Sequence, residues 1–281
     1  MKVVLSTELS APLLIRNSQN KDGFVQDLKR TVIELKIEGD VAVIQLVPPE
    51  GKPPTLDEEV LQQLDASLKE IEQSSVKLTY LKSASSKYFC VGANIGVLKE
   101  LSSDTVGEWV SYGNEVLNRL EDLPCPVVAV VSGYAMGGGL EIAMACDLIM
   151  AENDAKFSQS EAKLGFIPGW GGCRRLVDRV GASTAKYLFF TGAVLDGPLA
   201  LEYGLIDYSG TDSELAEYTD SFSQSVLGNN YNAVSTFKRI LNEEQRARRD
   251  RNTETEAISS KSCLEDDDTL KRLNDFLNKR G

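Results

Sequence analysis

Histidine is missing from the chain: none of its 281 residues is His. This absence excludes Ser-His-Asp and Cys-His catalysis, because both need an imidazole as the general base. It also excludes metal sites built on imidazole and removes the usual proton carrier near neutral pH. Acid–base chemistry in this protein must therefore come from carboxylates, Lys, Tyr, Cys or bound water.

Paired cysteine motifs and long apolar runs are also missing. The five Cys residues form no C-x-x-C motif, and an odd number in a long chain is typical of free thiols in a reducing compartment. No stretch approaches about 18 uninterrupted apolar residues, and the N-terminal segment lacks the apolar run of a signal peptide. We therefore expect a cytoplasmic protein that does not associate with a membrane.

Positive charge is scarce relative to negative charge. The chain has 30 Lys and Arg against 42 Asp and Glu, a net charge of −12. Because nucleic acids and anionic membranes are bound through Lys and Arg, neither is expected as a partner. A local basic pocket for a small anionic ligand stays compatible with this composition.

Alternating strand-like and helix-like segments predict an α/β fold with right-handed crossovers. Residues 31–38 and 41–47, separated by Gly39 and Asp40, predict a β-hairpin. Thr55 is a plausible N-cap for a helix that extends to Gln73. Further strands are expected at 76–81, 127–131 and 148–151, and further helices at 104–120 and 140–145. The unbroken apolar run 127–131 is typical of a strand buried on both faces.

The last third of the chain is predicted to be helical, with helices at 184–191, 197–203, 213–226, 233–241, 244–261 and 267–279. Residues 1–30 show little periodicity and are interpreted as an N-terminal extension. The resulting prediction is a core over residues 31–210 followed by a C-terminal helical region over residues 211–281.

Two glycine-rich segments follow strands, at residues 89–95 and 133–141. Glycine lets backbone N–H groups approach a ligand, and a helix that begins just after such a turn directs its free N–H groups there. Two such turns meeting in space would form an oxyanion hole. Neither contains the GxxxxGK[ST] pattern of a nucleotide P-loop. By themselves, the segments are equally compatible with tight turns that bind nothing.

Two glutamates accompany the second glycine-rich segment. Glu141 stands in the first turn of the helix that follows it, and Glu161 comes twenty positions later. A lone Glu is usually a solvated surface residue, and a Glu at a helix start usually stabilises the helix dipole. The spacing alone does not identify a catalytic pair.

Four motifs in order closely resemble the crotonase superfamily, the enoyl-CoA hydratases and isomerases: AxGGGxExAxACD, AxFxxxExxLGxxPGxGGxxRL, AKxLxFTG and AxxxGLID. Residues 128–207 match nearly position for position, and weaker similarity covers about residues 30–281. The resemblance implies an α/β fold, a crotonase-like spiral of ββα units with a C-terminal helical trimerisation region. It also implies a homotrimer or dimer of trimers, no metal, and no cofactor other than the coenzyme A that is part of the substrate thioester.

The resemblance also implies roles for individual residues. The N–H groups of Ala93 and Gly138 would form the oxyanion hole, and Glu141 and Glu161 fall on the two glutamates of the hydratase branch. Glu141 is assigned to the attacking water and Glu161 to the Cα proton. Phe276 and Lys279 match a C-terminal Phe-x-x-Lys that reaches CoA from a neighbouring subunit in relatives. The alternative for these two residues is an ordinary amphipathic helix end.

Three departures from the family pattern suggest a specialised member. Asn94 replaces the usual Asp at a position that serves loop structure in relatives, so the change is expected to be mild. Trp170 fills a site often held by a small residue, where it would shape or narrow the acyl pocket. Residues 48–54 lack the Asn-Arg-Pro stretch that lines the adenine side of CoA in relatives, so an acyl-carrier-protein thioester stays open as the substrate.

The sequence therefore predicts an enoyl-CoA hydratase or dehydratase, a lyase that works through a stabilised enolate. Two alternatives stay open. One is a C–C bond hydrolase, decarboxylase or Δ3,Δ2-enoyl isomerase on the same scaffold. The other is a non-catalytic crotonase-fold binding protein.

Overall fold

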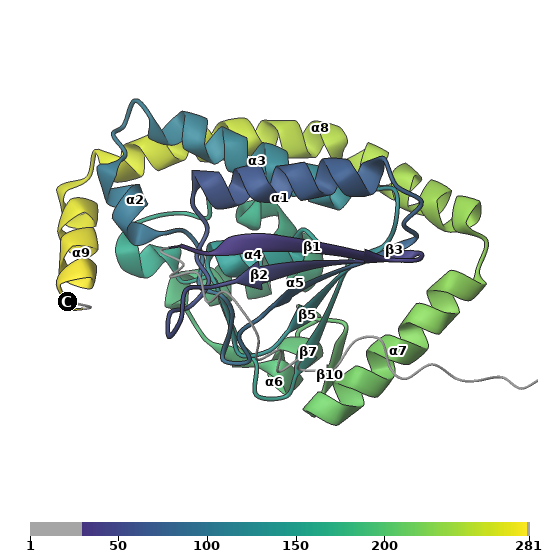
Figure 1. The fold of residues 1–281 in the computed structure, drawn as a ribbon. Helices are drawn as coiled ribbons and strands as arrows, with labels where there is room; N and C mark the ends of the chain where they lie inside the picture. The colour runs from purple at the N-terminus through teal and green to yellow at the C-terminus, as the bar shows by residue number, and fades with distance from the viewer. Residues whose placement is uncertain (1–29, 280–281) are drawn as a thin grey trace, which may run out of the picture.

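The computed structural model describes residues 30–279 and contains two β-sheets (Figure 1). The proposed N-terminal extension lies outside the described residues except for Arg30. The larger sheet has the strand order β1-β2-β3-β5-β7-β10 and the smaller one β4-β6-β8-β9. The strands of the larger sheet are β1 (Val32–Glu38), β2 (Val41–Val47), β3 (Leu78–Ser83), β5 (Val127–Val131), β7 (Leu148–Glu152) and β10 (Tyr208–Gly210). Those of the smaller sheet are β4 (Tyr88–Cys90), β6 (Tyr134–Met136), β8 (Lys156–Ser158) and β9 (Leu195–Asp196).

Successive pairs of strands contribute one strand to each of the two sheets. Each of the pairs β3/β4, β5/β6 and β7/β8 places its first strand in the larger sheet and its second in the smaller, and helices follow. Parallel pairing joins β2-β3-β5-β7-β10 and β4-β6-β8, whereas the β1-β2 hairpin and the β8-β9 pair are antiparallel. The expected hairpin and the spiral of ββα units are thus both present.

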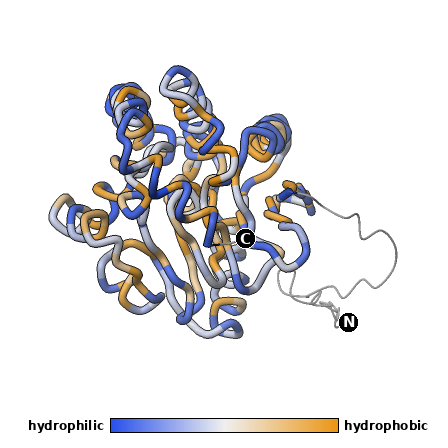
Figure 2. The backbone as a smooth tube through the Cα atoms, turned by 90° about the vertical axis from the view of Figure 1, so that its left-hand side faces the viewer, coloured by the Kyte–Doolittle hydropathy of each residue, from blue (hydrophilic) through white to orange (hydrophobic). Residues whose placement is uncertain are grey.

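The larger sheet is covered on both faces, as the apolar run 127–131 predicted. Val127, Ala129 and Val131 face the main core. Val128 and the partly buried Val130 pack in a separate cluster with residues of helix α7 (Asp212–Gly228). Because side chains alternate along a strand, burial of both sets requires cover on each face. Figure 2 shows hydrophobic segments gathered in the interior and hydrophilic ones on the outer helices.

The first helix, α1 (Glu58–Glu72), begins three residues later than Thr55, which we expected to cap it. Asp57 is the N-cap, since its side chain accepts a hydrogen bond of 3.0 Å from the N–H of Val60. Thr55 is held outside the helix, because its N–H donates to Thr31 Oγ1 at 2.9 Å. The carboxylate of Asp57, at the N-cap, also interacts favourably with the helix dipole.

Two later helices differ from the prediction in length. Helix α5 (Gly172–Thr191) consists of two helical segments joined by a kink at Gly181, whose φ of 75° and ψ of 161° are not helical. The second segment contains the expected residues 184–191, and the first segment was not expected. Helix α8 (Tyr231–Leu264) is continuous where two helices were expected. Asn242, in the expected gap, donates through its side-chain amide to the carbonyl of Glu121 at 2.8 Å. A polar contact with a neighbouring helix therefore replaces the expected break.

Helices from the first half of the chain and from its C-terminal end lie together on one side of the molecule (Figure 1). Helix α8 packs along α3 (Val106–Asp122), and α9 (Asp267–Asn278) packs on α2 (Ile95–Glu100) and on the short 3₁₀ helix η1 (Glu161–Leu164). An apolar cluster made by Leu98, Val110, Phe166 and Leu273, among others, joins them. The remaining helices are α4 (Gly138–Met144) and α6 (Gly197–Glu202). No helix in residues 30–279 is long and apolar enough to span a bilayer.

Candidate active site

The two glycine-rich segments meet in the structure. A Cβ atom on Gly139 would lie 1.9 Å from the carbonyl oxygen of Cys90, and one on Gly92 would lie 2.9 Å from the nitrogen of Gly138. Gly92 also has a φ of 91°, a conformation that favours glycine. The backbones of the two turns are therefore in direct contact, and this contact depends on the missing side chains.

Ala93 and Gly138 present N–H groups at this junction. Gly138 is the first residue of α4, where backbone N–H groups have no partner within the helix. The loop around Ala93 is fixed by its neighbours: Leu56 N–H donates to Gly92 O and Asn94 N–H donates to Leu56 O, both at 2.9 Å. The backbone hydrogen bonds outside regular elements in residues 30–279 include none donated by Ala93 or Gly138. Both residues line the same cavity, where their N–H groups are candidates for binding a ligand oxygen.

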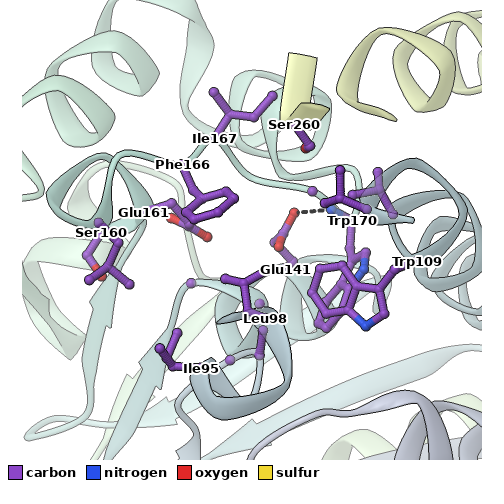
Figure 3. Close-up of a pocket in the computed structure, with 18 of the residues that line it drawn as sticks. Ile95, Leu98, Trp109, Glu141, Ser160, Glu161, Phe166, Ile167, Trp170 and Ser260 are labelled. Atoms are coloured by element: carbon purple, nitrogen blue, oxygen red, sulfur yellow. Dashed lines mark hydrogen bonds between the residues drawn. The ribbon is translucent and has the colours of Figure 1, made fainter. Parts of the chain in front are cut away.

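Glu141 is buried in the first turn of α4, with 3% of its surface exposed. Its Oε1 accepts a hydrogen bond from the N–H of Trp170 at 2.7 Å (Figure 3) and another from the N–H of Gly172 at 2.9 Å. The loop that leads into α5 therefore holds this carboxylate in place. A Cβ on Gly172 would approach Glu141 Oε1 to 2.7 Å, which explains a glycine at that position.

Glu161 is the first residue of η1 and also lines the cavity. Its Oε1 accepts a hydrogen bond of 2.6 Å from the side-chain amide of Gln159. Its Oε2 is buried and has no hydrogen-bond partner among the described residues. An unpartnered buried carboxyl oxygen is costly in a folded protein and is typical of a functional group that awaits its substrate.

Burial and nearby negative charge raise the pKa values of both glutamates. Burial raises the pKa of Glu161 from its ordinary value of 4.5 to about 7. The hydrogen bond from Gln159 lowers this pKa, and the nearby charge of Glu256 raises it further. Burial also raises the pKa of Glu141, reinforced by the charges of Glu161 and Glu256 and opposed by the two backbone hydrogen bonds. Raised pKa values of this kind are typical of carboxylates that take part in proton transfer.

This pKa shift predicts a pH dependence of stability. Glu161 binds its proton more tightly in the folded state, so the free energy of unfolding falls as pH rises from about 4.5 to about 7. At about 1.4 kcal/mol per pKa unit, Glu161→Gln should be more stable than the wild type above pH 7, by about 1–3 kcal/mol. Urea unfolding at pH 5 and pH 8 measures the difference. Equal changes in both proteins over this range would contradict it. Glu70→Gln, at an exposed position of α1, is the control.

A third buried carboxylate, Glu256 on α8, was not identified from the sequence. It is 1% exposed and accepts hydrogen bonds from the N–H of Gly171 at 2.8 Å, the N–H of Cys173 at 3.3 Å and the side-chain amide of Asn114 at 3.2 Å. The glutamate thus ties α8 to the start of α5, next to the N–H groups that hold Glu141. Its position within a polar stretch of α8 resembles any solvated glutamate, so the sequence carried no signal for it.

Replacing Glu256 by Gln should alter both stability and the pH profile of activity. Gln places an amide against N–H donors, and one unsatisfied buried group costs about 1–3 kcal/mol of unfolding free energy. Loss of the negative charge also lowers the pKa values of Glu141 and Glu161, so the pH–rate profile should move to lower pH. A profile that keeps its position while the melting temperature falls would assign Glu256 a structural role alone.

The cavity that Glu141 and Glu161 line has a volume of about 100 Å³ and adjoins a wide groove of about 860 Å³. The two share Val91, Ala93, Ile95, Ser160 and Leu164 as lining residues. The groove is locally basic despite the net charge of the chain. Its charged lining residues are Lys87, Lys163, Arg272 and Lys279 against Asp275. An anionic group attached to the ligand in the cavity can therefore lie in the groove.

Phe276 and Lys279 line this groove in their own chain. Their helix α9 packs on η1, which begins with Glu161. The structure thus places Phe276 and Lys279 beside the cavity of the chain to which they belong. Within residues 30–279, no group of three or more His, Cys, Asp or Glu side chains is arranged to hold a metal ion.

Two of the three departures from the family pattern have a structural explanation. Asn94 is the N-cap of α2, and its side chain accepts a hydrogen bond of 3.0 Å from the N–H of Gly96, so the expected role in loop structure is confirmed. Trp170 lines the cavity, as expected of a residue that shapes it. Residues 48–54 are not among those that line the groove in the described part of the chain.

Comparison with known proteins gives a consistent result. A family model described as enoyl-CoA hydratase/isomerase matches residues 36–281. The short-chain-enoyl-CoA hydratase of Clostridium acetobutylicum is 34% identical over 247 residues, which cover 88% of this chain and 94% of that protein. The crotonyl-CoA hydratase of Syntrophomonas wolfei is 32% identical over 248 residues, covering 88% and 95%. The crystal structure of enoyl-CoA hydratase from Bacillus halodurans superposes with a TM-score of 0.80 at 24% identity, covering 86% of this chain and 98% of that one, and so shares the fold.

Proposed function

The chain belongs to the enoyl-CoA hydratase/isomerase family, and we propose that it adds water across the Cα=Cβ bond of a 2-enoyl-CoA thioester. One observation carries this proposal. Glu141 and Glu161 line a single cavity together with two backbone N–H groups that make no other hydrogen bond among those described. Hydration needs both an acid and a base beside a stabilised thioester oxygen, and this cavity provides all three.

The proposed mechanism proceeds through an enolate. The N–H groups of Ala93 and Gly138 donate to the thioester oxygen, and negative charge collects on that oxygen when water oxygen attacks Cβ. One glutamate removes a proton from the water, and the other gives a proton to Cα as the enolate collapses. The product is a 3-hydroxyacyl thioester, and the same groups catalyse the reverse dehydration. Donors already fixed in the protein stabilise the enolate without having to reorient.

The hydrogen bonds support different roles for the two glutamates. Oε1 of Glu141 accepts two backbone N–H groups that hold this carboxylate in place, which suits a group that orients water, so we assign Glu141 to the water. Glu161 has a buried Oε2 without a partner among the described residues, which is available to exchange a proton with the substrate, so we assign Glu161 to Cα. Retention of both carboxylates favours hydration over hydrolysis, decarboxylation or isomerisation on the same scaffold.

We propose coenzyme A as the carrier, held in the basic groove. CoA carries several phosphates, and the lysines and arginine of the groove match that charge. Phe276 and Lys279 would contact it from within the same chain. An acyl-carrier-protein thioester is the alternative, and kinetic comparison of the same acyl group on both carriers separates them.

The homotrimer or dimer of trimers also stays a proposal. Large apolar side chains are exposed on α5 and α8, among them Phe190 at 74%, Phe237 at 66% and Ile258 at 64%. Exposed apolar surface of this kind supports association with further copies through the C-terminal region. All five cysteines are free thiols, which supports the proposed cytoplasmic location.

The direct test is the absorbance of the conjugated enoyl thioester. Purified protein mixed with crotonyl-CoA should remove this band rapidly and reach the hydration equilibrium. Starting from 3-hydroxybutyryl-CoA, the band should appear. The proposed activity would be refuted if the absorbance changed in neither direction with 2-enoyl-CoAs and 3-hydroxyacyl-CoAs of several chain lengths.

A further inference from the structure

Two tryptophans form one end of the cavity. Trp109 on α3 and Trp170 in the loop before α5 have ring centroids 4.6 Å apart, with planes tilted by 47°. Figure 3 shows the pair on one side of Glu141, with Ser160 and Glu161 on the other. Ser160 also lines the basic groove, so a thioester that enters from the groove passes the glutamates before its tail meets the indoles.

Trp170 is fixed by two glycines that leave room for its ring. A Cβ on Gly113 would lie 2.1 Å from its Nε1, and one on Gly138 would lie 2.8 Å from its Cζ3. The indole is therefore wedged between α3 and the proposed oxyanion turn, with 1% of its surface exposed. A side chain held this tightly cannot swing away to admit a longer ligand without moving backbone.

The volume of the cavity limits the length of the acyl group. A dry apolar cavity of about 150 Å³ holds benzene, with its six carbons. The present cavity has about 100 Å³ and includes the space beside Ala93, Gly138 and the glutamates, where the thioester carbonyl and the double bond would lie. By the same ratio it accommodates about four carbons in all.

The charge of the cavity limits the chemistry of the tail. No Lys or Arg is among its lining residues in the described part of the chain, whereas Glu141 and Glu161 are. Glu256 adds a third carboxylate close enough to raise the pKa values of both. A tail that ends in a carboxylate would lose its hydration and lie near the negative charge of these glutamates without a cationic partner.

We propose that the Trp109–Trp170 pair is the floor of the acyl pocket and restricts the enzyme to short, uncharged 2-enoyl thioesters of about four carbons. This inference rests on the proposed hydratase function, because that function places the acyl group in the cavity. It goes further in naming the substrate class and the residues that select it.

The test compares chain lengths in the wild type and in Trp109→Ala. The ratio of kcat/KM for 2-octenoyl-CoA to that for crotonyl-CoA should be at most about 1:100 in the wild type, since a pocket discriminates by roughly 10-fold or more per excluded methylene. Trp109→Ala removes half of the floor and leaves the glutamates, so the ratio should rise at least about 10-fold. Tyr112→Ala, on the same helix but not in the cavity lining, should leave the ratio unchanged. Equal wild-type rates on both substrates, or an unchanged ratio in Trp109→Ala, would overturn the inference.

Binding of unreactive ligands separates this inference from the proposed activity. Calorimetry should show that wild-type protein binds butyryl-CoA at least about 10-fold more tightly than octanoyl-CoA, and that Trp109→Ala narrows the gap. This result holds even if no substrate is hydrated, in which case the activity fails and the pocket assignment stands. If Trp109→Ala does not fold, Trp109→Phe and the chain-length preference of the wild type still test the pocket assignment. Glutaconyl-CoA, with a terminal carboxylate, should react at least about 100-fold more slowly than crotonyl-CoA, and equal rates would refute the charge argument.

Discussion

Replacing Glu141 or Glu161 by Gln should lower kcat for hydration of crotonyl-CoA by about 10²–10⁴-fold in each case. Gln keeps the size of the side chain and one acceptor oxygen, but it neither takes a proton from water nor delivers one to Cα. In Glu141→Gln the remaining oxygen can still accept the N–H groups of Trp170 and Gly172, so the loop should keep its position. The measurement is the initial rate of loss of the enoyl-thioester absorbance.

Binding distinguishes a chemical effect from a structural one in these variants. Both should bind butyryl-CoA with nearly the wild-type Kd, because the groove and the two proposed oxyanion donors are untouched. Glu70→Gln, at an exposed position on α1, should have wild-type kcat. Near-wild-type kcat in either cavity variant would remove that glutamate from the mechanism.

Gly139→Ala should reduce kcat/KM by about 10²–10³-fold, the usual effect of losing one oxyanion donor. The added Cβ would lie 1.9 Å from the carbonyl oxygen of Cys90, a backbone atom that a rotamer change cannot move. The turns that carry Ala93 and Gly138 must then separate, which would disrupt the oxyanion hole proposed for their N–H groups. Overpacking of this kind should also lower the free energy of unfolding by about 1–3 kcal/mol.

A matched glycine provides the control for this experiment. A Cβ added to Gly228, at the end of α7, would meet no atom of another part of the chain within 4 Å, so Gly228→Ala should preserve both activity and stability. Activity and thermal stability are measured for both variants. Wild-type kcat/KM in folded Gly139→Ala would show that contact between the two turns is not needed for catalysis.

Local patterns predicted the sheet better than the ends of the helices. The apolar run 127–131 correctly indicated a strand buried on both faces, because such burial leaves no polar alternation. The N-cap at Thr55 was wrong, since the tertiary hydrogen bond from its N–H to Thr31 keeps it extended. The start of α5 at Gly172 was missed, because the Gly-rich segment before it has low helix propensity and its first N–H groups are satisfied by distant carboxylates.

The candidate site followed from the family motifs more than from residue chemistry. Spacing alone did not identify Glu141 and Glu161 as a pair, and only the resemblance brought them together. The structure places both in one cavity. Glu256 could not be found, because its partners at Gly171 and Cys173 are more than eighty positions away. Trp109 was missed for the same reason, since its contact with Trp170 exists only after α3 packs against the loop before α5.

The most direct test of the central claim is the fate of solvent atoms in the product. Crotonyl-CoA incubated with the protein in H₂¹⁸O should yield 3-hydroxybutyryl-CoA with ¹⁸O in its C3 hydroxyl group, detected by mass spectrometry. The same reaction in D₂O should yield a product with one deuterium on Cα, detected by NMR. This result would establish addition of water across the Cα=Cβ bond, with a proton delivered to Cα. Products without solvent oxygen at C3, such as a shifted double bond or free CoA with the released acid, would contradict the account and place the protein in another branch of its family.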